Sequence, residues 1–491
     1  MRFDDTNPTT EKQEYIDSAL DNIKWLGHKP YKITYASDYF EQLYEYAVKL
    51  IKEGKAFVCH QTPEEIAKSR EERTPSPYRD RPMEESLKLF EDMKKGKIGE
   101  GKATLRLKMD YKSDNPNMRD LIAYRIKFAE HPHVGDKWCI YPSYDYTHCI
   151  CDSTENITHS LCTLEFELRN EPYRWILDAL DIYRSPQIEY SRVSVTYTVL
   201  SKRRLIKLVD ERHVRGWDDP RMPTINGMRR RGYTAEALNK FCEVIGITKN
   251  QQNIIRLETL EHQVRSHLND IAKRGFGVLE PLEVHINNYG EGKVEHFEAV
   301  DFPSNPNSTK HTIPFSNTIY IEAGDFREKD TKGFYGLAPG KRVRLRYAYV
   351  IECESFEKDE KGNVKRVVAK YIPNEKVEKN PKGVLHWVAK TLDASSPIVA
   401  EVRLYDTLFT EEAPGKRTKN FLDDLNPNSL LIKNNCFLDT SFKSAKHFDK
   451  FQLERVGFFS VDPDSTENKL VLNLTVSLKE SKDRKQLTET N

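Results

Sequence analysis

The stretch TVLSKRRL, residues 198–205, stands where the pattern of the sequence changes. Upstream of it, helical and strand-like segments alternate; downstream, the chain is mostly helical to about residue 275 and β-like beyond that point. The apolar start of the stretch is followed by Ser201, Lys202 and two arginines. Such a basic cluster is usually a solvated surface. The alternative is a mobile loop in which Lys202 stabilises charge that develops on a phosphate during nucleotidyl transfer.

The upstream part predicts mixed α/β structure. Residues 39–51 have helical periodicity, and Gly54 follows as a C-cap before the strand-like AFVCH. Thr62 and Glu65 predict a capping box at the start of a second helix, and residues 84–97 predict a third. The segments ATLRLKMD and KWCIYP alternate like strands. The residues of the first helix that share an apolar face are Phe40, Leu43, Ala47 and Leu50.

The downstream part divides into a helical region and a β-rich region. Thr234 is expected to cap the helix AEALNKFCEVIG, and residues 252–273 predict another helix. The buried stripe of the capped helix is expected to be Leu238, Phe241, Cys242 and Ile245. From about residue 276, the segments KRVRLRYAYVIECESFE, VKRVVAKYI, GVLHWVAK, SPIVAEVRLYDTLF and KLVLNLTVSLK have strand character. Many short strands without helices predict one or two β-barrels.

The composition limits the class of protein. A chain of 491 residues exceeds one hydrophobic core, so two to four domains are expected. Its 31% charged and 38% apolar residues are typical of a soluble globular protein. Lys and Arg (77) nearly balance Asp and Glu (76), so local basic patches would have to hold any nucleic acid. No apolar stretch approaches the roughly 20 residues of a membrane helix, and the N-terminus has no signal-peptide pattern.

The eight cysteines are not arranged like a disulfide framework, which predicts reduced thiols and a cytoplasmic location. Cys149 and Cys151 lie beside His148, which raises the question of a zinc site. Two ligands separated by one residue match the usual zinc-ligand spacing poorly, and no second well-spaced pair follows. The sequence therefore predicts buried thiols and no metal site.

Two further segments are dense in polar groups: RFDDTNP, residues 2–8, and YDYTHCICDSTENITHSLCTLEF, residues 144–166. Together with TVLSKRRL they resemble the glutamine–tRNA ligase family of class I aminoacyl-tRNA synthetases, in which VLSKR is similar to the KMSKS signature. The segments SPYRDRP, GWDDPRMPT, RRRGYT, ITHSLCTLEF and VRLYDTLF resemble hallmarks of that family in the family's order. The resemblance extends over essentially the whole chain.

The resemblance implies an α/β Rossmann-like catalytic domain, incomplete at its N-terminus, and all-β anticodon-binding barrels after it. The catalytic part would contain an acceptor-binding insertion and a helical subdomain that carries the KMSKS-like loop. The implied parts are residues 1–33 and 144–192 for the two halves of the nucleotide-binding fold, 34–143 for the insertion, 193–275 for the helical subdomain and 276–491 for two barrels.

A HIGH-type ATP-binding motif is expected upstream of RFDDTNP, where only Met1 precedes Arg2. The LGH of WLGHKP, residues 25–30, follows RFDDTNP and is interpreted as a chance look-alike. We therefore expect an N-terminally truncated synthetase that is inactive by itself. The alternative is a catalytically inactive paralogue that binds tRNA without charging it.

The resemblance also implies roles for individual residues. Asp4 corresponds to the residue that binds the α-amino group of glutamine, where a carboxylate pairs with an ammonium. Tyr144 corresponds to the tyrosine that reads the side-chain amide, and Gln187 to a supporting polar residue. Lys202 is the expected catalytic residue, which stabilises charge in the transition state. The implied ATP-binding positions are Thr163, Arg192, Val193, Leu200, Ser201 and Lys202.

The choice between glutamine and glutamate depends on Cys162. The counterpart of THSLC in glutamate–tRNA ligases resembles THALR, in which an arginine can pair with the γ-carboxylate of the substrate. A neutral thiol gives a buried carboxylate no counter-charge, and burying an unpaired charge is costly. An amide needs only hydrogen bonds, for example from Tyr144. Glutamine is favoured, and a glutamate–tRNA ligase is the alternative.

The implied reaction joins L-glutamine to glutamine tRNA in two steps, with ATP as a substrate and Mg²⁺ as its phosphate-bridging ion. Arginines of the insertion are candidates for phosphate contacts or, alternatively, for surface ion pairs: Arg79, Arg81, Arg119 and Arg125. The residues of the β-rich part expected to read anticodon bases are Arg327, Arg403, Gln452 and Arg455. Other synthetases are further candidate partners. No association with a membrane is expected.

Overall fold

The computed structural model describes residues 1–10, 12–249, 254–393 and 395–479. The chain divides into two compact units, one made of Met1–Val193 with Gly246–Asn253 and the other of Ser194–Ile245 with Ile254–Asn491. None of the helices in the described ranges is both long and apolar enough to span a membrane.

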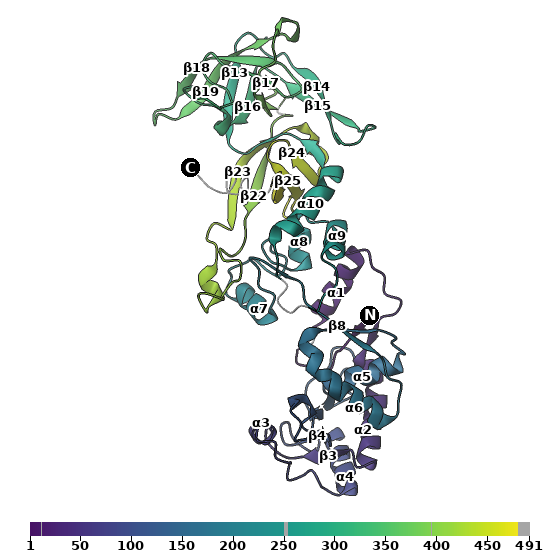
Figure 1. Ribbon diagram of the computed structural model, residues 1–491. Coiled ribbons are helices and arrows are strands. Elements are labelled where there is room, and N and C mark those ends of the chain that lie inside the picture. The colour runs from purple at the N-terminus through teal and green to yellow at the C-terminus, as the bar shows by residue number, and fades with distance from the viewer. Residues whose placement is uncertain (11, 250–253, 394, 480–491) are drawn as a thin grey trace. The chain divides into compact units, whose positions relative to one another are not determined.

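The first unit contains two pairs of parallel strands accompanied by helices (Figure 1). One pair joins β1 (Arg2–Phe3) to β2 (Thr34–Tyr35), and the other joins β7 (Ser160–Thr163) to β8 (Gln187–Tyr190). The helices are α1 (Gln13–Trp25), α5 (Tyr144–Thr154) and α6 (Asn170–Leu180). Parallel strands that alternate with helices are the α/β pattern predicted from the sequence.

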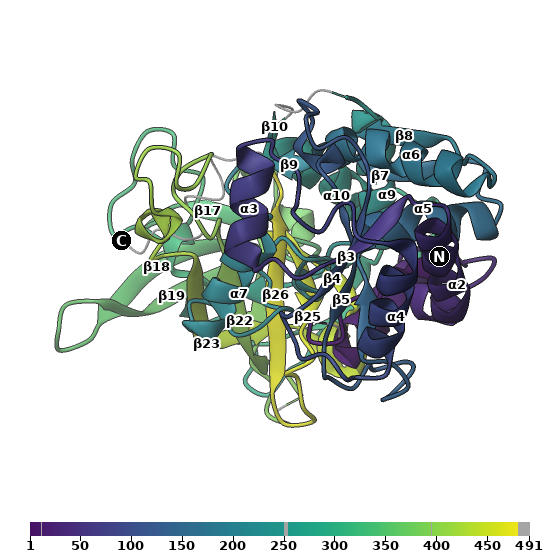
Figure 2. The same cartoon turned by 90° about the horizontal axis from the view of Figure 1, so that it is seen from below.

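Between these pairs in the sequence, an antiparallel sheet forms with the order β3-β4-β5-β6. Its strands are Ala56–Cys59, Thr104–Leu107, Ile122–Ile126 and Ile140–Pro142, and its helices are α2 (Phe40–Lys52), α3 (Pro63–Glu71) and α4 (Met83–Lys94). Figures 1 and 2 both show α4 beside β3. The predicted apolar face of α2 lies in the core with Phe90 and Tyr124. The capping box of Thr62 and Glu65 is confirmed, and Gly54 has the positive φ of 68° that its position requires.

The second unit begins with short elements that position the KMSKS-like loop. They are β9 (Ser194–Val195), which pairs in parallel with β10 (Ile254–Ile255), and the helices α7 (Lys202–Asp210), α8 (Ile225–Arg231), α9 (Ala235–Ile245) and α10 (Leu257–Ile271). Thr234 Oγ1 accepts a hydrogen bond from the amide of Ala237 at 3.3 Å, as expected of a cap. The predicted stripe of α9 is wrong at Cys242, which is exposed. Cys242 falls just outside the arc that Ala237, Leu238 and Phe241 bury.

Two seven-stranded sheets follow, each around its own core. The first, called the first barrel, has the order β20-β17-β18-β19-β13-β16-β21, and the second barrel has the order β11-β24-β25-β26-β22-β23-β12. The strands of the first are β13 (Pro281–Ile286), β16 (Thr318–Glu322), β17 (Arg342–Leu345), β18 (Val350–Lys358), β19 (Val364–Ile372), β20 (Val384–Leu385) and β21 (Val388–Ala389), with the hairpin β14 (Glu295–Val300) and β15 (Lys310–Phe315) beside them. The strands of the second are β11 (Lys273–Gly275), β12 (Gly277–Val278), β22 (Ile398–Tyr405), β23 (Leu430–Leu438), β24 (Lys450–Leu453), β25 (Gly457–Val461) and β26 (Leu470–Ser477).

Helix α8 is fastened to the second barrel. Arg231 donates hydrogen bonds to the carbonyls of Thr475 (3.2 Å) and Tyr405 (3.1 Å), and Arg230 pairs with Asp462 at 3.0 Å. At Gly232, whose φ is +112°, an added Cβ would lie 2.2 Å from Thr475 Oγ1. Glycine therefore permits both the backbone conformation that ends α8 and its close approach to β26.

Candidate functional site

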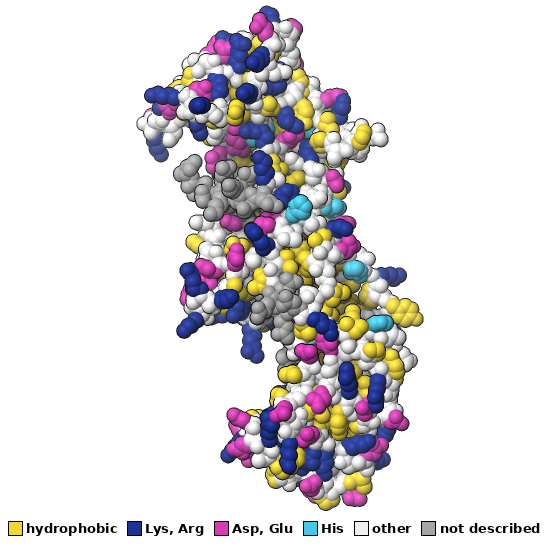
Figure 3. All heavy atoms as spheres, viewed as in Figure 1, with side chains coloured by type: hydrophobic (Ala, Val, Ile, Leu, Met, Phe, Trp, Pro, Cys, Tyr) yellow, Lys and Arg dark blue, Asp and Glu magenta, His cyan; other side chains and the backbone are white. Residues whose placement is uncertain are grey.

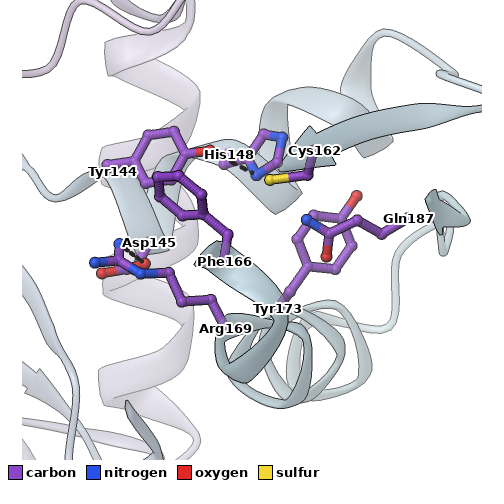
Figure 4. Close-up of a pocket in the computed structure, with 8 residues that line it drawn as sticks. All are labelled: Tyr144, Asp145, His148, Cys162, Phe166, Arg169, Tyr173 and Gln187. Carbon is purple, nitrogen blue, oxygen red and sulfur yellow. Dashed lines mark hydrogen bonds and ion pairs between the residues drawn. The ribbon is translucent and has the colours of Figure 1, made fainter. Parts of the chain in front are cut away.

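A hollow in the first unit is lined by side chains from α5, β7, β8, α6 and the 3-10 helix η3 (Leu164–Arg169) (Figure 4). It contains about 240 Å³ of space, part of which is open solvent. The lining residues are Tyr144, Asp145, His148, Cys162, Phe166, Arg169, Tyr173 and Gln187. The structure thus brings together three residues of the predicted glutamine site, Tyr144, Cys162 and Gln187.

A chain of hydrogen bonds runs along α5 behind the hollow. The hydroxyl of Tyr144 lies 3.3 Å from Nδ1 of His148, and Nε2 of His148 lies 3.2 Å from Oδ2 of Asp152. The Tyr144 and His148 rings stack with centroids 5.2 Å apart. Ser160 Oγ, whose hydroxyl donates to Oδ2 of Asp152 at 2.6 Å, lies 3.4 Å from Nε2 of His148 and can accept its proton. In that tautomer Nδ1 of His148 accepts the tyrosine proton. The remaining lone pairs of the Tyr144 oxygen are then available as acceptors.

Asp152 is itself held in place by several donors. Its Oδ2 accepts hydrogen bonds from Ser160 (2.6 Å) and Tyr173 (2.9 Å), and its Oδ1 pairs with Arg2. Burial alone would lower the pKa of Arg2, but Asp152 and Asp4 outweigh it and raise that pKa. Burial, reinforced by Asp4, raises the pKa of Tyr144 well above its ordinary value, so the phenol stays protonated.

Asp4, the predicted ligand of the α-amino group, is oriented by Arg2, which also pairs with Asp152. Its Oδ1 accepts a hydrogen bond from Nε of Arg2 at 3.0 Å. The Asp4 side chain is still 31% exposed, so an ammonium group can reach it. The arrangement combines an oriented carboxylate with an open face, which suits charge-assisted binding of an amine.

The other walls of the hollow present little net charge. Burial raises the pKa of the Cys162 thiol, which therefore stays neutral. Gln187 follows on the neighbouring strand, and no partner for its buried Oε1 is found among the described residues. Arg169 pairs with Asp145 and lies over the ring of Phe166, 5.0 Å from its centroid.

The predicted nucleotide-binding residues are divided between the two units. In the first, Thr163 ends β7, Nε of Arg192 lies 2.8 Å from Oε1 of Glu165, and Val193 is exposed outside any strand. In the second, Leu200, Ser201 and Lys202 are exposed where α7 begins. The helix behind this loop is anchored by a core whose members include Val199, Leu208 and Phe421. The ATP-binding roles stay predictions.

The expectation that Arg403 reads an anticodon base conflicts with its position. Its side chain is 6% exposed and bonds Glu401 at 2.6 Å and Asp464 at 2.7 Å. A buried guanidinium needs such partners, and these contacts leave little of it for a base. The ion pairs favour a structural role, in which Arg403 joins β22 to the loop that follows β25; base reading by Arg403 stays a prediction.

The other candidate RNA contacts differ in availability. Arg455 forms two hydrogen bonds to Asp325, at 2.7 and 2.8 Å. Gln452 is half-buried, whereas Arg327 is exposed and lies 4.3 Å from the ring centroid of Phe334. In the insertion, Arg79, Arg81 and Arg119 donate to the backbone carbonyls of Met109, Val58 and Ser113. No partner for Nε of Arg125 is found among the described residues.

The cysteine- and histidine-rich part of α5 does not assemble a metal centre. Across the described ranges, no group of three or more His, Cys, Asp or Glu side chains is placed to hold a metal ion. Cys149 is buried and directs its thiol to the backbone carbonyl of Tyr146 at 3.5 Å.

Comparison with known proteins identifies the family. Residues 1–270 match the family model described as "tRNA synthetases class I (E and Q), catalytic domain". The chain belongs to this family. Residues 272–372 and 384–462 match two anticodon-binding domains of the same class I tRNA synthetases. The predicted α/β catalytic domain followed by two barrel-like domains is therefore confirmed.

Relatives of this synthetase family are similar over nearly the whole chain. A "Probable glutamine--tRNA ligase" of Dictyostelium discoideum is 52% identical over 99% of this chain and 61% of its own length. A "Glutamine--tRNA ligase, cytoplasmic" of Arabidopsis thaliana is 51% identical over 98% and 61%. A "Glutamine--tRNA ligase" of Cupriavidus taiwanensis is 47% identical over 98% of this chain and 86% of its own length. The chain thus spans about three fifths of the first two relatives, and the predicted resemblance to glutamine–tRNA ligases is confirmed.

Proposed function

We propose that the protein attaches L-glutamine to glutamine tRNA with ATP, and that this chain supplies the pocket that selects the glutamine side chain. The observation that carries this proposal is the chain of hydrogen bonds from Tyr144 through His148 and Ser160 to Asp152, which leaves the Tyr144 oxygen as an acceptor at the hollow. An amide NH₂ can donate to that oxygen and a carboxylate cannot. Polar recognition of this kind discriminates by around 10⁴.

Glutamate fits the same hollow less well. Its γ-carboxylate would need a counter-charge, and Cys162 supplies none. The Arg169 guanidinium is already paired with Asp145. The neutral wall therefore favours glutamine over the alternative of a glutamate–tRNA ligase.

The proposed reaction has two steps. Asp4 binds the α-amino group, the glutamine carboxylate attacks the α-phosphate of ATP, and pyrophosphate leaves. The terminal ribose hydroxyl of the tRNA then takes the glutaminyl group, and AMP is released. Lys202, at the exposed start of α7, would stabilise the charge that develops on the α-phosphate. Mg²⁺ would accompany ATP by bridging its phosphates.

Binding of tRNA is supported by the two anticodon-binding domain matches. On the face drawn in Figure 3, Lys and Arg side chains gather over the first barrel among scattered acidic ones, and β19 contributes Lys365, Arg366 and Lys370 to this barrel. The Arabidopsis relative is named as a cytoplasmic enzyme, which supports a cytoplasmic location for this protein. The division of the chain into five parts and an association with other synthetases are also proposals, and both follow from the family resemblance.

The test is ATP-dependent charging of tRNA by the native protein with radiolabelled glutamine and, separately, glutamate. Glutamine is expected to be charged with a specificity constant about 10³-fold or more above that of glutamate. A preference for glutamate would contradict the proposal. Binding of tRNA without charging of either amino acid would instead support the inactive paralogue.

A further inference from the structure

The ion pair between Asp145 and Arg169 lies outside the hydrogen-bond chain that orients Tyr144. Asp145 is in the first turn of α5 and Arg169 ends η3, and both line the hollow (Figure 4). Nη1 of Arg169 bonds Oδ1 of Asp145. The guanidinium lies 5.0 Å from the ring centroid of Phe166 and 6.0 Å from that of Tyr144. Asp145 and the two rings thus hold the cation against the wall of the pocket.

Arg169 is the cation that a glutamate side chain would need. Among the described residues that line the hollow, it is the one Lys or Arg. A guanidinium binds a carboxylate in a bidentate, charge-assisted way, which makes it a strong partner for a γ-carboxylate. In the structure, Nη1 of the Arg169 guanidinium is already bonded to Asp145.

Asp145 also places a negative charge at the hollow, where it would repel the γ-carboxylate of a bound glutamate. Burial is the main cause of the raised pKa of Tyr144, and the carboxylates of Asp4, Asp145 and Asp152 add to it. All three carboxylates therefore act electrostatically on the Tyr144 hydroxyl. Arg2 pairs with Asp4 and Asp152, whereas Asp145 pairs with Arg169. Removing the Asp145 charge would both release Arg169 and reduce the repulsion of an anionic ligand.

We infer that Asp145 determines specificity: by holding Arg169, it denies a γ-carboxylate its counter-charge and keeps the pocket selective for the uncharged amide. This inference rests on the proposed function, since it assumes that the hollow receives the glutamine side chain. Asp145 acts through Arg169 and is therefore a positioning residue.

The decisive variant is Asp145→Asn, which keeps the size of the side chain and removes its charge. The dissociation constants of glutamine and of glutamate for the full chain are measured by isothermal titration calorimetry. The ratio of the glutamate constant to the glutamine constant is expected to fall about tenfold or more, because a charge-assisted contact becomes available. In Asp145→Asn/Arg169→Gln the ratio is expected to return toward that of the unaltered protein.

A matched control is Asp178→Asn, which removes a carboxylate that pairs with Arg184 at an exposed site of α6. It should leave the ratio within about twofold. Thermal unfolding checks that each variant is folded, and Asp145→Ser takes the place of Asp145→Asn if the latter is not.

Two results would overturn the inference while leaving the proposed function intact. One is glutamine-selective binding by the unaltered protein with an unchanged ratio in Asp145→Asn. The other is an equal fall of the ratio in the single and double variants, which would show that Arg169 is not involved. Binding of neither amino acid by the unaltered protein would overturn the proposed function and this inference with it.

Discussion

The hydroxyl of Tyr144 lies 3.3 Å from Nδ1 of His148, one turn further along α5. A tyrosine hydroxyl can donate or accept. Nε2 of His148 lies 3.4 Å from Oγ of Ser160, whose own proton goes to Asp152, so the contact favours donation from Tyr144 to Nδ1. The proton of Tyr144 is directed into the protein and its lone pairs into the hollow. In the proposed function, His148 and Ser160 would thus favour a ligand that donates a hydrogen bond to Tyr144, without touching the ligand themselves.

His148→Phe tests this relationship. Phenylalanine keeps the ring stack on Tyr144 and removes both hydrogen bonds of the imidazole. The KM for glutamine is expected to rise about tenfold, and the preference for glutamine over glutamate to fall, because Tyr144 can now turn its proton toward the ligand. Steady-state charging by the native protein measures both. His159→Phe, at an exposed position, is the control; an unchanged KM in His148→Phe would refute the role of this contact.

Cys162→Arg tests the amide specificity at another lining residue of the hollow, on β7. The new guanidinium would give a γ-carboxylate the counter-charge that the neutral thiol lacks. We expect glutamine charging to fall by about tenfold or more and the relative use of glutamate to rise. Competition of both amino acids in one charging assay reports the ratio. The exposed Cys242→Arg adds the same charge far along the sequence, on α9, as a control; unaltered selectivity in Cys162→Arg would exclude a role for this position.

Arg403→Ala distinguishes a structural arginine from one that reads bases. Removing it leaves the buried Glu401 without this partner, so the free energy of unfolding should fall by about 3 kcal/mol. Arg327→Ala, at an exposed site, should change it by no more than about 0.5 kcal/mol. Urea denaturation followed by circular dichroism measures both. Unchanged stability together with a raised KM for tRNA would support Arg403 as a base-reading residue and contradict the structural role.

Lys450 should make stability depend on pH. Its ammonium donates to Oγ of Ser460 at 2.8 Å, and burial lowers its pKa to about 7 although Asp449 opposes the shift. Between that value and the unfolded pKa of about 10.4, the unfolded state binds more protons, so the free energy of unfolding rises with pH. Below pH 7 both states are protonated and the cost of covering the charge is present in full.

Lys450→Met should therefore raise the melting temperature most near pH 6.5 and lose this advantage by about pH 9.5. Differential scanning calorimetry of the variant and the unaltered protein at these two pH values provides the measurement. Lys443→Met, at an exposed position, should show no such pH-dependent difference. A difference between Lys450→Met and the unaltered protein that is the same at both pH values would contradict the lowered pKa.

Much of the fold was predictable because local chemistry and global packing agree. The capping box of Thr62 and Glu65, the buried face of α2 and the change from helices to strands after α10 all depend on short-range patterns. Cys242 was misassigned because hydrophobicity marks the buried arc of a helix only to within one position.

The residues of the candidate site were harder to predict from the sequence. Tyr144 and Cys162 were found through the family resemblance, whereas His148, Asp152 and Arg169 were missed. A signal for two of them existed: residues 144, 148 and 152 recur at intervals of four and so share one face of α5. The partners of Arg403, by contrast, come from β22 itself and from the loop after β25, which no local pattern brings together.

The bonds between α8 and the second barrel affect how this part of the chain unfolds. Because Arg230 bonds Asp462, Arg231 bonds the carbonyls of Thr475 and Tyr405, and Gly232 closely approaches Thr475, the helical region and that barrel should lose their structure in one cooperative transition. A proteolytic fragment that starts after α10 would expose Asp462 and the carbonyls of β26. One that starts near Ser194 would retain these contacts between α8 and the barrel, so a stable limit fragment is expected there.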